Sequence, residues 1–293
     1  LLSQMTIRKM ILVDMNQVTL SNLMVQLGGN KNVEPDFVRH MVLNSLRSYR
    51  TKFVNEYGEL VLCYDNKVNW RREYFPNYKF SRRKDRKQSK LDWNKIFDTL
   101  HMIRDELTEY FPYKVLEVEN AEADDIIASV VFHVAKEPKN YEKVLILSSD
   151  KDFIQLQKYN FVSQYSPIQK QFVNGKCPES YIKEHILKGD RSDGVPNFLS
   201  PDNTFVDELR QRPISKRKLE TWIELQPEDF CDENMLRNYQ RNRTLIDLSY
   251  IPDNIRQACI DTFLNTKIGS RKDLLNYFIR NKLKSLMENI GDF

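Results

Sequence analysis

The sequence predicts an α/β protein with a central, mainly parallel sheet and flanking helices, followed by a helical C-terminal domain. Over residues 1–175, short apolar runs alternate with segments of helical apolar spacing, as in parallel strands joined by crossover helices. Beyond residue 178 the strand-like runs fade and helical spacing dominates. The turn signal Asn174-Gly175 separates the two patterns. We therefore expect two domains, at residues 1–175 and 176–293.

Four short, largely apolar segments are the expected strands, because a strand buried on both faces shows little alternation. They span residues 10–13, 60–64, 113–118 and 144–147. Apolar residues at helical spacing predict helices between and after these strands. The expected helices span residues 36–53, 93–107, 121–134, 178–187, 215–225, 228–246, 254–264 and 271–287.

Composition excludes several classes of protein. The 293 residues are 41% hydrophobic and 29% charged, which is typical of a folded chain rather than a disordered one. Without a long apolar run, we expect no membrane span, no secretory signal and a cytoplasmic location. The four cysteines form no C-x-x-C pair, which argues against zinc and against a disulfide framework. No P-loop motif is present, so nucleotide hydrolysis of that type is disfavoured.

The positive charge is concentrated in one stretch, residues 67–90, which we call the basic strap. It holds ten Lys/Arg and two acidic residues, a local charge of +8 against +4 for the whole chain, so the remainder carries −4. Aromatic residues are interleaved with these cations. Because lysine and arginine bind phosphates and aromatic rings stack on unpaired bases, the strap predicts nucleic-acid contact. A solvated charged loop is the alternative. A weaker cluster at Lys216, Arg217 and Lys218 fits either a phosphate contact or a charged helix face.

Carboxylates recur where the predicted strands end. The carboxyl ends of parallel strands share one edge of a sheet, so we expect the side chains to converge there. Such crowding raises their pKa values unless a cation is bound. Two divalent ions about 3.5–4 Å apart can hydrolyse a phosphodiester, and oxygen ligands favour magnesium over zinc. Any single aspartate has the alternative role of a helix cap or turn residue. The carboxylates are Asp14, Asp65, Glu122, Asp124, Asp125, Asp150, Asp152, Asp190 and Asp193.

The four histidines are scattered along the chain, and three of them lie in predicted helices. For each we expect a core or surface role rather than a ligand role. They are His40, His101, His133 and His185.

The order of these motifs resembles the flap endonuclease / 5′-nuclease superfamily, most closely its ribonuclease H branch from T-even-type bacteriophages. The E-A-D-D and S-D-x-D-F-x-Q-L segments together, at this spacing, are specific for that superfamily. The likeness covers nearly the whole chain. The matching segments are Cys63-Tyr64-Asp65-Asn66, Trp70-Arg71-Arg72, Tyr78-Lys79-x-x-Arg82, Ala121-Glu122-Ala123-Asp124-Asp125, Ser149-Asp150-Lys151-Asp152-Phe153-Ile154-Gln155-Leu156 and Gly189-Asp190-x-x-Asp193.

The resemblance implies a metal-dependent 5′→3′ exonuclease with flap endonuclease activity that removes RNA primers and adjacent DNA during lagging-strand replication. It implies two Mg²⁺ ions, which Mn²⁺ can replace. The implied partners are RNA–DNA hybrids and flap DNA, a phage single-strand-binding protein and a sliding clamp, and the implied state is a monomer. The implied residue roles are one ion on Asp14, Asp65, Asp124 and Asp150, a second ion on Asp152, Asp190 and Asp193, ligand or supporting carboxylates at Glu122 and Asp125, catalysis by Lys79 and Arg82, and substrate contacts by Arg71 and Tyr78.

One segment departs from the superfamily. Residues 197–202 lack the glycines of the helix-two-turn-helix that grips duplex DNA with a potassium ion, so Lys216, Arg217 and Lys218 are the expected substitutes. Two other functions stay open at this point. One is an inactive, structure-specific DNA-binding protein of a replication complex. The other is a PIN-type ribonuclease acting on single strands, against which the long basic strap and the large helical part weigh.

Overall fold

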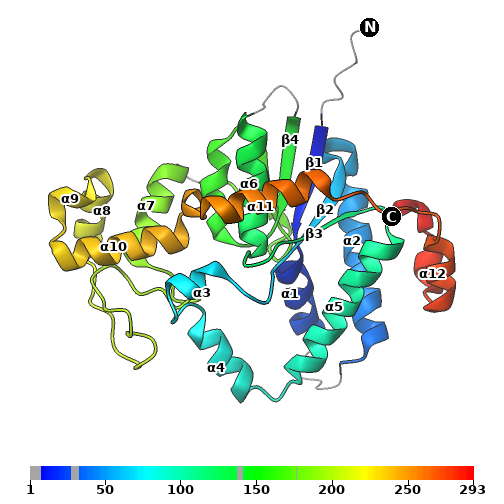
Figure 1. Ribbon diagram of the computed structural model, residues 1–293, viewed down its shortest axis with the longest axis horizontal. Coiled ribbons are helices and arrows are strands. Elements are labelled where there is room, and N and C mark those ends of the chain that lie inside the picture. Colours follow the sequence, from blue (N-terminus) through cyan, green and yellow to red (C-terminus); the bar gives the residue numbers. More distant parts are fainter. Residues whose placement is uncertain (1–7, 28–32, 137–140, 176) are drawn as a thin grey trace, which may run out of the picture.

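The computed structural model describes residues 8–27, 33–136, 141–175 and 177–293. Its centre is a six-stranded sheet in the order β3-β2-β1-β4-β5-β6, parallel except for β6 (Figure 1). The four expected strands are present, so the predicted fold class is confirmed. The strands are β1 (Arg8–Asp14), β2 (Glu59–Tyr64), β3 (Lys114–Glu117), β4 (Tyr141–Leu147), β5 (Val162–Ser166) and β6 (Gln171–Phe172).

Two strands, β5 and β6, and three helices, α1, α3 (Trp70–Tyr74) and α4 (Phe80–Gln88), were not expected from the sequence. The short β5 and β6 contain Ser163, Gln164 and Gln171, and these polar residues hide the strand pattern. Helix α1 (Met15–Leu27) begins directly after β1, and its apolar residues do not gather on one face. Two expected helices are each interrupted. Asp232 caps a new helix within 228–246, and a break within 271–287 gives two short helices.

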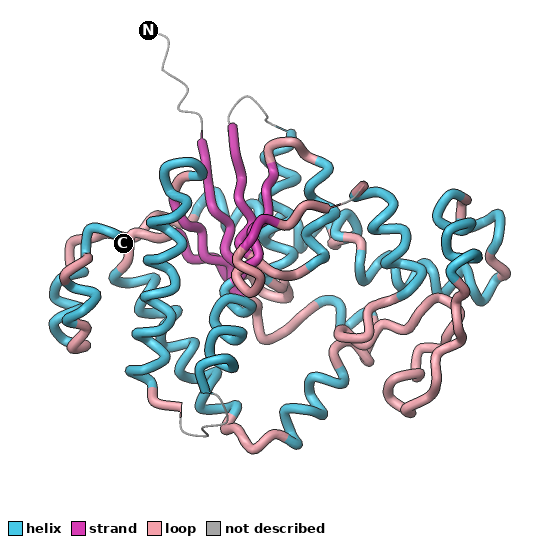
Figure 2. Tube along the Cα trace, turned by 180° about the vertical axis from the view of Figure 1, so that it is seen from behind, coloured by secondary structure: helices cyan, strands magenta, loops and turns pink. Residues whose placement is uncertain are grey.

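Helices cover both faces of the sheet (Figures 1 and 2). On one face, α1, α2 and α5 pack on alternate strand residues such as Ile11 and Val13. On the other face, α6 and α11 pack on Leu12 and Ile146. The helices of this part of the chain are α2 (Pro35–Tyr57), α3 (Trp70–Tyr74), α4 (Phe80–Gln88), α5 (Trp93–Tyr110) and α6 (Ala123–Lys136).

Residues 253–293 return to the sheet. Helix α11 lies along α6 (Figure 1). Tyr277, Phe278 and the terminal Phe293 surround Phe111 in the core beneath α2 and α5. The expected domain boundary near residue 175 stays a prediction. The remaining helices are α7 (Pro178–Lys188), α8 (Lys216–Glu224), α9 (Pro227–Phe230), α10 (Glu233–Ile246), α11 (Asp253–Asn265), α12 (Leu274–Arg280) and α13 (Lys284–Met287).

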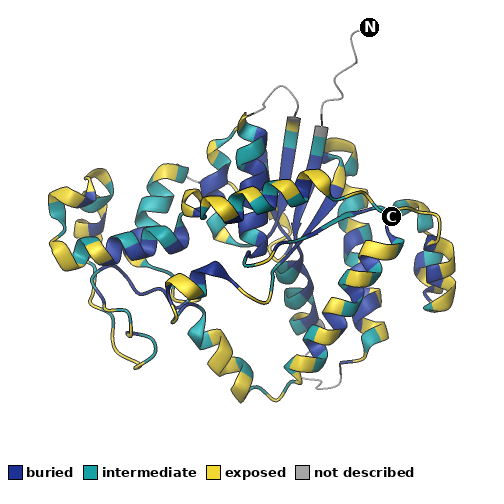
Figure 3. Cartoon of the chain, in the orientation of Figure 1, coloured by how far each residue is buried: buried dark blue, intermediate teal, exposed yellow. Residues whose placement is uncertain are grey.

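A separate lobe formed by α7 to α10 stands beside the sheet. Its small core holds Phe198, Leu219 and Tyr239, with Trp222 stacked on Phe230 at a ring separation of 5.3 Å. The central strands β1, β2 and β4 are mostly buried, whereas α4 and α8 carry mostly exposed residues (Figure 3). Within the described ranges, no helix is both long and apolar enough to cross a membrane.

Candidate active site

The predicted carboxylates gather at the carboxyl edge of the sheet, which we call the acidic rim. Asp14 ends β1, Asp65 directly follows β2, and Asp150 follows β4 by three residues. Because these three strands run parallel, their ends lie at one edge. Asp124 joins them from the first turn of α6. Four carboxylates from distant parts of the chain therefore meet at one place.

Neighbouring groups fix the orientation of these side chains. The Ser148 hydroxyl donates a hydrogen bond of 2.9 Å to Asp14 Oδ2. The backbone N–H of Ala123 donates one of 2.7 Å to Asp65 Oδ1, which ties the start of α6 to the end of β2. The Gln17 N–H also donates to Asp14 Oδ1 at 3.1 Å. A carboxylate oxygen that accepts one hydrogen bond keeps a second lone pair, and a cation can use it.

These four carboxylates are crowded together with too little positive charge beside them, which shows in their pKa values. Burial raises the pKa of Asp14 to about 6, and the charge of Asp65 adds to the effect. Burial and Asp152 raise the pKa of Asp150 to about 7. The pKa of Asp124 is raised by burial and by Asp150 and Asp14. Among the described residues, no lysine, arginine or histidine forms an ion pair with any of the four. A bound divalent cation would relieve this repulsion.

Glu122 stands beside this group but is fully paired with the basic strap. Lys79 Nζ lies 2.6 Å from Glu122 Oε1, and the Tyr78 hydroxyl and Arg71 reach Oε2 at 2.9 and 3.2 Å. Burial opposes ionisation, but Lys79 and Arg71 hold the pKa of Glu122 at about 2. The strap thus contributes a cation next to the acidic rim.

Asp193 connects the strap to the turn after α7. Arg82 Nη2 lies 2.5 Å from Asp193 Oδ1, and the Tyr78 hydroxyl lies 2.8 Å from Asp193 Oδ2. The backbone N–H of Lys79 donates a bond of 2.7 Å to the Asp193 carbonyl. The strap residues predicted to act on the substrate are therefore held in place before any substrate binds.

Arg71 and Asp125 form a buried ion pair beneath the strap. Arg71 Nη2 lies 2.8 Å from Asp125 Oδ1, and the Arg71 Nε donates to the Leu245 carbonyl at 3.0 Å. The Trp70 indole donates to Asp125 Oδ2 at 3.1 Å. Arg71 is only 3% exposed, so this position fits a residue that fastens the strap to α6. Its contact with a phosphate stays a prediction.

A second group contains a histidine that sequence reasoning missed. Ligand atoms of Asp152, His185 and Asp190 all lie within 4.8 Å of one another. His185 Nδ1 is 3.1 Å from Asp152 Oδ1, and its Nε2 is 3.4 Å from Asp190 Oδ2. Although burial opposes it, the two carboxylates raise the pKa of His185 to about 10. His185 therefore lies in the acidic group, a position that sequence reasoning did not anticipate, and its role as a metal ligand stays a prediction.

The end of α7 explains how His185 comes to the rim. Gly189 follows the helix at φ +68°, and its N–H donates to the His185 carbonyl. A Cβ at Gly189 would lie 2.4 Å from the Val195 carbonyl oxygen, so the turn requires glycine. The turn sends Asp190 back toward the last turn of α7. In the sequence, the spacing His-x-x-x-Gly-Asp was the signal that could have placed His185 near Asp190.

These groups fit a divalent cation. Asp152 Oδ1 and His185 Nδ1 are buried and make no hydrogen bond, although they are close together. A hollow of about 430 Å³ opens beside Asp150, Asp152 and Asp190. Carboxylate oxygens with unused lone pairs next to open space are what a hard cation requires.

Comparison with known proteins decides the family. Residues 10–185 match the family model described as 5′-3′ exonuclease, N-terminal resolvase-like domain, and residues 176–293 match the one described as T4 RNase H, C terminal. The chain is 34% identical over 292 residues to the ribonuclease H of Enterobacteria phage T4, which covers 96% of this chain and 95% of that protein. The chain belongs to the 5′-3′ exonuclease family. The predicted family is thereby confirmed.

Other relatives agree with this assignment. A 5′-3′ exonuclease of Buchnera aphidicola subsp. Schizaphis graminum (strain Sg) is 30% identical over 175 residues, or 57% of each chain. The fold is that of the bacteriophage T5 D15 flap endonuclease in a complex with DNA and metal ions. That structure superposes with a TM-score of 0.56 at 17% identity and covers 98% of this chain and 100% of its own. This 5′-3′ exonuclease is a metal-dependent phosphodiester hydrolase, as the sequence predicted.

The structure of this 5′-3′ exonuclease does not bring all predicted residues to the rim. Lys216, Arg217 and Lys218 form the exposed first turn of α8 in the lobe of α7 to α10 (Figures 1 and 3). Their role in gripping duplex DNA stays a prediction.

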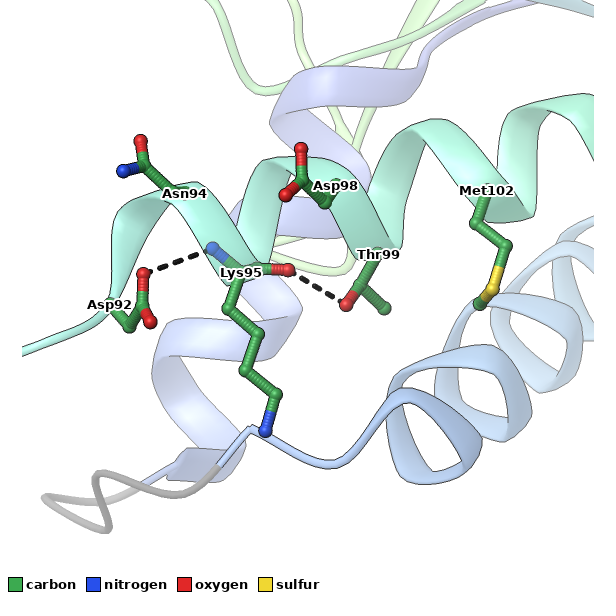
Figure 4. Close-up of a pocket in the computed structure, with 6 residues that line it drawn as sticks. All are labelled: Asp92, Asn94, Lys95, Asp98, Thr99 and Met102. Carbon is green, nitrogen blue, oxygen red and sulfur yellow. Dashed lines mark hydrogen bonds between the residues drawn. The ribbon is translucent and has the colours of Figure 1, made fainter.

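Another hollow lies outside the site of this 5′-3′ exonuclease, at the start of α5 (Figure 4). Asp92 caps the helix by accepting from the Lys95 N–H at 3.0 Å, and the Thr99 hydroxyl donates to the Lys95 carbonyl at 2.7 Å. These bonds belong to the helix itself, so we assign this hollow no chemistry.

Proposed function

We propose that this 5′-3′ exonuclease removes the RNA of RNA–DNA hybrids and the unpaired 5′ strand of flap DNA, using two Mg²⁺ ions. The observation that carries the proposal is the cluster of Asp14, Asp65, Asp124 and Asp150. These four carboxylates lack a protein counter-charge and lie next to strap cations that are already oriented. The T4 relative is named ribonuclease H, and the T5 neighbour is a flap endonuclease bound to DNA.

The proposed ligands form two groups. Asp14, Asp65, Asp124 and Asp150 would hold one ion. Asp152, Asp190 and Asp193 would hold the other, with His185 at its side. Oxygen donors favour Mg²⁺, and Mn²⁺ accepts the same ligands together with a histidine nitrogen. When bound, the ions supply an activated water and stabilise the leaving oxygen.

The strap residues would orient the phosphate. Lys79 and Arg82 lie between the acidic rim and the exposed surface of α4, and both are charged at neutral pH because adjacent carboxylates raise their pKa values against the effect of burial. A substrate phosphate beside Lys79 and Arg82 would replace the adjacent carboxylates as their anionic partner. The Tyr78 hydroxyl can donate to Glu122 or to Asp193, so it can hold either carboxylate in position.

The decisive experiment is Asp150→Asn, assayed with a 5′-labelled RNA–DNA hybrid and a 5′-flap DNA in Mg²⁺. We expect cleavage to fall by more than about 100-fold, the upper range for losing a residue that merely supports a metal ligand. Mg²⁺ binding measured by calorimetry should weaken in parallel. Asp98→Asn, an exposed aspartate on α5, removes the same charge away from the rim and should change neither. Unchanged cleavage by Asp150→Asn would refute the metal assignment.

The same assay separates the alternatives. A DNA-binding protein without catalysis would bind forked DNA and leave it uncut. A PIN-type ribonuclease would cut unpaired RNA and ignore duplex ends. The family match over both parts of the chain supports the hybrid and flap substrates instead.

The replication partners also belong to this proposal. We expect the exonuclease to act as a monomer in the host cytoplasm, together with a phage single-strand-binding protein and a sliding clamp. Sedimentation of the purified chain alone, and then with each partner, tests both points. A stable dimer, or no shift with either partner, would count against them.

A further inference from the structure

Strand β5 carries two polar side chains that contact residues 148–150, the segment between β4 and the acidic rim, which we call the rim segment. Successive side chains of a strand point to opposite faces, so Gln164 and Ser166 share one face. Both are only 1% exposed, although both are polar. Because β5 pairs in parallel with β4 and Gln164 lies opposite Ile146, this polar face stands where the chain leaves β4.

The side-chain amide of Gln164 holds the backbone of the rim segment at two points. Its Nε2 donates to the Ser148 carbonyl at 3.0 Å and to the Asp150 carbonyl at 2.6 Å. An amide nitrogen carries two N–H donors, so each carbonyl receives its own. Gln157 Nε2 donates to Gln164 Oε1 at 3.0 Å, which fixes the orientation of the amide. Gln164 therefore fixes the backbone on both sides of Ser149.

Ser166 holds the same segment through a side chain. Its hydroxyl is hydrogen-bonded to the Ser149 hydroxyl at 2.7 Å, and Ser149 Oγ also accepts from the Ile168 N–H at 3.2 Å. The Ser149 N–H donates to Gln17 Oε1 at 3.3 Å. The two polar side chains of β5 thus contact all three residues of the rim segment.

The direction of the Asp150 carboxylate depends on this backbone. Its Oδ1 accepts from the Asp152 N–H at 2.9 Å, a bond within the same turn. The Asp150 N–H donates to Ser148 Oγ at 3.1 Å, and that hydroxyl in turn donates to Asp14. A carboxylate with such local bonds moves with its own backbone. Gln164, which holds that backbone from the neighbouring strand, therefore sets where Asp150 lies relative to Asp14.

The alternative is that Gln164 only stabilises the fold, since buried carbonyls need hydrogen-bond partners wherever they lie. The direction of its bonds favours a role at the rim, because both donors lead to the rim segment. A second buried amide shows the contrast. Gln155 donates to the Ile246 carbonyl at 3.1 Å and accepts from the Leu248 N–H at 2.8 Å, so its bonds lead to the end of α10.

We propose that Gln164, assisted by Ser166, is a positioning residue for metal binding. It holds the rim segment so that Asp150 and Asp14 converge on one cation. The proposal rests on the proposed function for the assignment of Asp150 as a metal ligand. Hydrogen-bond partners behind a metal ligand orient it, and their loss typically costs roughly 10- to 100-fold in metal affinity.

The test is the Mg²⁺ affinity of the full chain, measured by calorimetry without substrate. Gln164→Met keeps the length of the side chain but leaves the Ser148 and Asp150 carbonyls without their donors. We expect its Mg²⁺ dissociation constant to rise by about 10-fold or more. Ser166→Ala removes only the contact with Ser149, and it should weaken Mg²⁺ binding in the same direction by a smaller factor. This milder variant decides the question if Gln164→Met does not fold.

The matched control is Gln155→Met, which removes a buried amide whose bonds lead away from the rim segment. It should lower the midpoint of urea unfolding in chelator but leave the Mg²⁺ affinity near that of the wild type. Equal weakening of Mg²⁺ binding in Gln164→Met and Gln155→Met would overturn the proposal, as would wild-type affinity in Gln164→Met or in Ser166→Ala. Since no cleavage is measured, a wild-type chain that binds Mg²⁺ but cuts neither substrate would refute the proposed function and leave this inference standing.

Discussion

Lys79 Nζ lies 2.6 Å from Glu122 Oε1, and this contact joins the basic strap to the acidic rim. Lys79 adopts a left-handed backbone conformation at φ +54°, which turns its side chain under the strap while its N–H reaches the Asp193 carbonyl. The cation is therefore fixed by backbone and side chain together. Charges oriented in advance need no rearrangement during reaction, which makes them effective in catalysis.

Replacing Lys79 should separate catalysis from binding. For Lys79→Ala we expect kcat to fall by about 100-fold or more, the usual cost of removing one preoriented donor, with a much smaller change in substrate affinity. Single-turnover cleavage and metal-free binding measure the two quantities. Lys87→Ala, on the exposed end of the same strap, should reduce kcat far less. Equal losses of rate and affinity in Lys79→Ala would argue against a role at the scissile phosphate.

Docking of the strap depends on Gly194. This residue has φ +74°, and a Cβ there would lie 2.9 Å from the Asn77 carbonyl oxygen and 3.5 Å from the Lys79 nitrogen. Gly194→Ala should therefore push the strap away from the rim and slow cleavage by roughly 10- to 100-fold, because small displacements of catalytic groups are costly. The matched control is Gly291→Ala, where a Cβ meets nothing within 4 Å. Full activity in Gly194→Ala would show that the strap tolerates displacement.

The strands and the acidic rim could be predicted from the sequence, because simple physical rules determine both. Buried parallel strands need continuous apolar residues, as in Leu145-Ile146-Leu147, and topology alone then brings Asp14, Asp65 and Asp150 to one edge. Strand β5, next to the edge of the sheet, lacks such a run because Ser163 and Gln164 interrupt it, so it was missed.

Contacts between residues far apart in the chain could not be predicted from the sequence. Arg71 and Asp125 are 54 positions apart, and nothing in either segment says that a buried ion pair forms. An arginine in a basic stretch is as compatible with a phosphate as with a carboxylate. His185 was missed because its two partners come from different turns, at Asp152 and Asp190, and only the folded chain places it between them.

The metal-free protein should lose stability as pH rises from about 4 to about 7. Burial, with nearby carboxylates, raises the pKa of Asp14 to about 6 and of Asp150 to about 7, while unfolded aspartates titrate near 3.9. In this window the folded chain holds protons that the unfolded chain has released, so the free energy of unfolding falls with rising pH. We expect a loss on the order of a few kcal/mol in urea titrations with a chelator present.

Two comparisons test whether the buried aspartates cause this pH dependence of stability. Asp150→Asn should flatten the pH dependence, since its side chain cannot ionise. Adding a divalent metal at pH 7.5 should make the wild-type protein more stable again, because the metal binds the ionised carboxylates. Glu122, whose pKa is held at about 2, contributes a nearly constant stabilisation across this window, and that contribution is lost only as the pH falls below it. Stability that rises between pH 4 and 7 in both proteins would contradict the explanation.

His185 should also make the protein less stable as the pH rises, but over a higher pH range. Against the effect of burial, Asp152 and Asp190 raise its pKa from 6.5 to about 10. Its contribution to folding is therefore fully present below pH 6.5 and is lost as pH rises through 10. In metal-free buffer at pH 7.5, His185→Gln should lower the free energy of unfolding by on the order of 2 kcal/mol, and the difference from wild type should shrink toward pH 10. His101→Gln, on the exposed surface of α5, is the matched control and should show no such difference. A deficit in His185→Gln that stays constant with pH would mean that the histidine contributes by packing alone, without its charge between the two carboxylates.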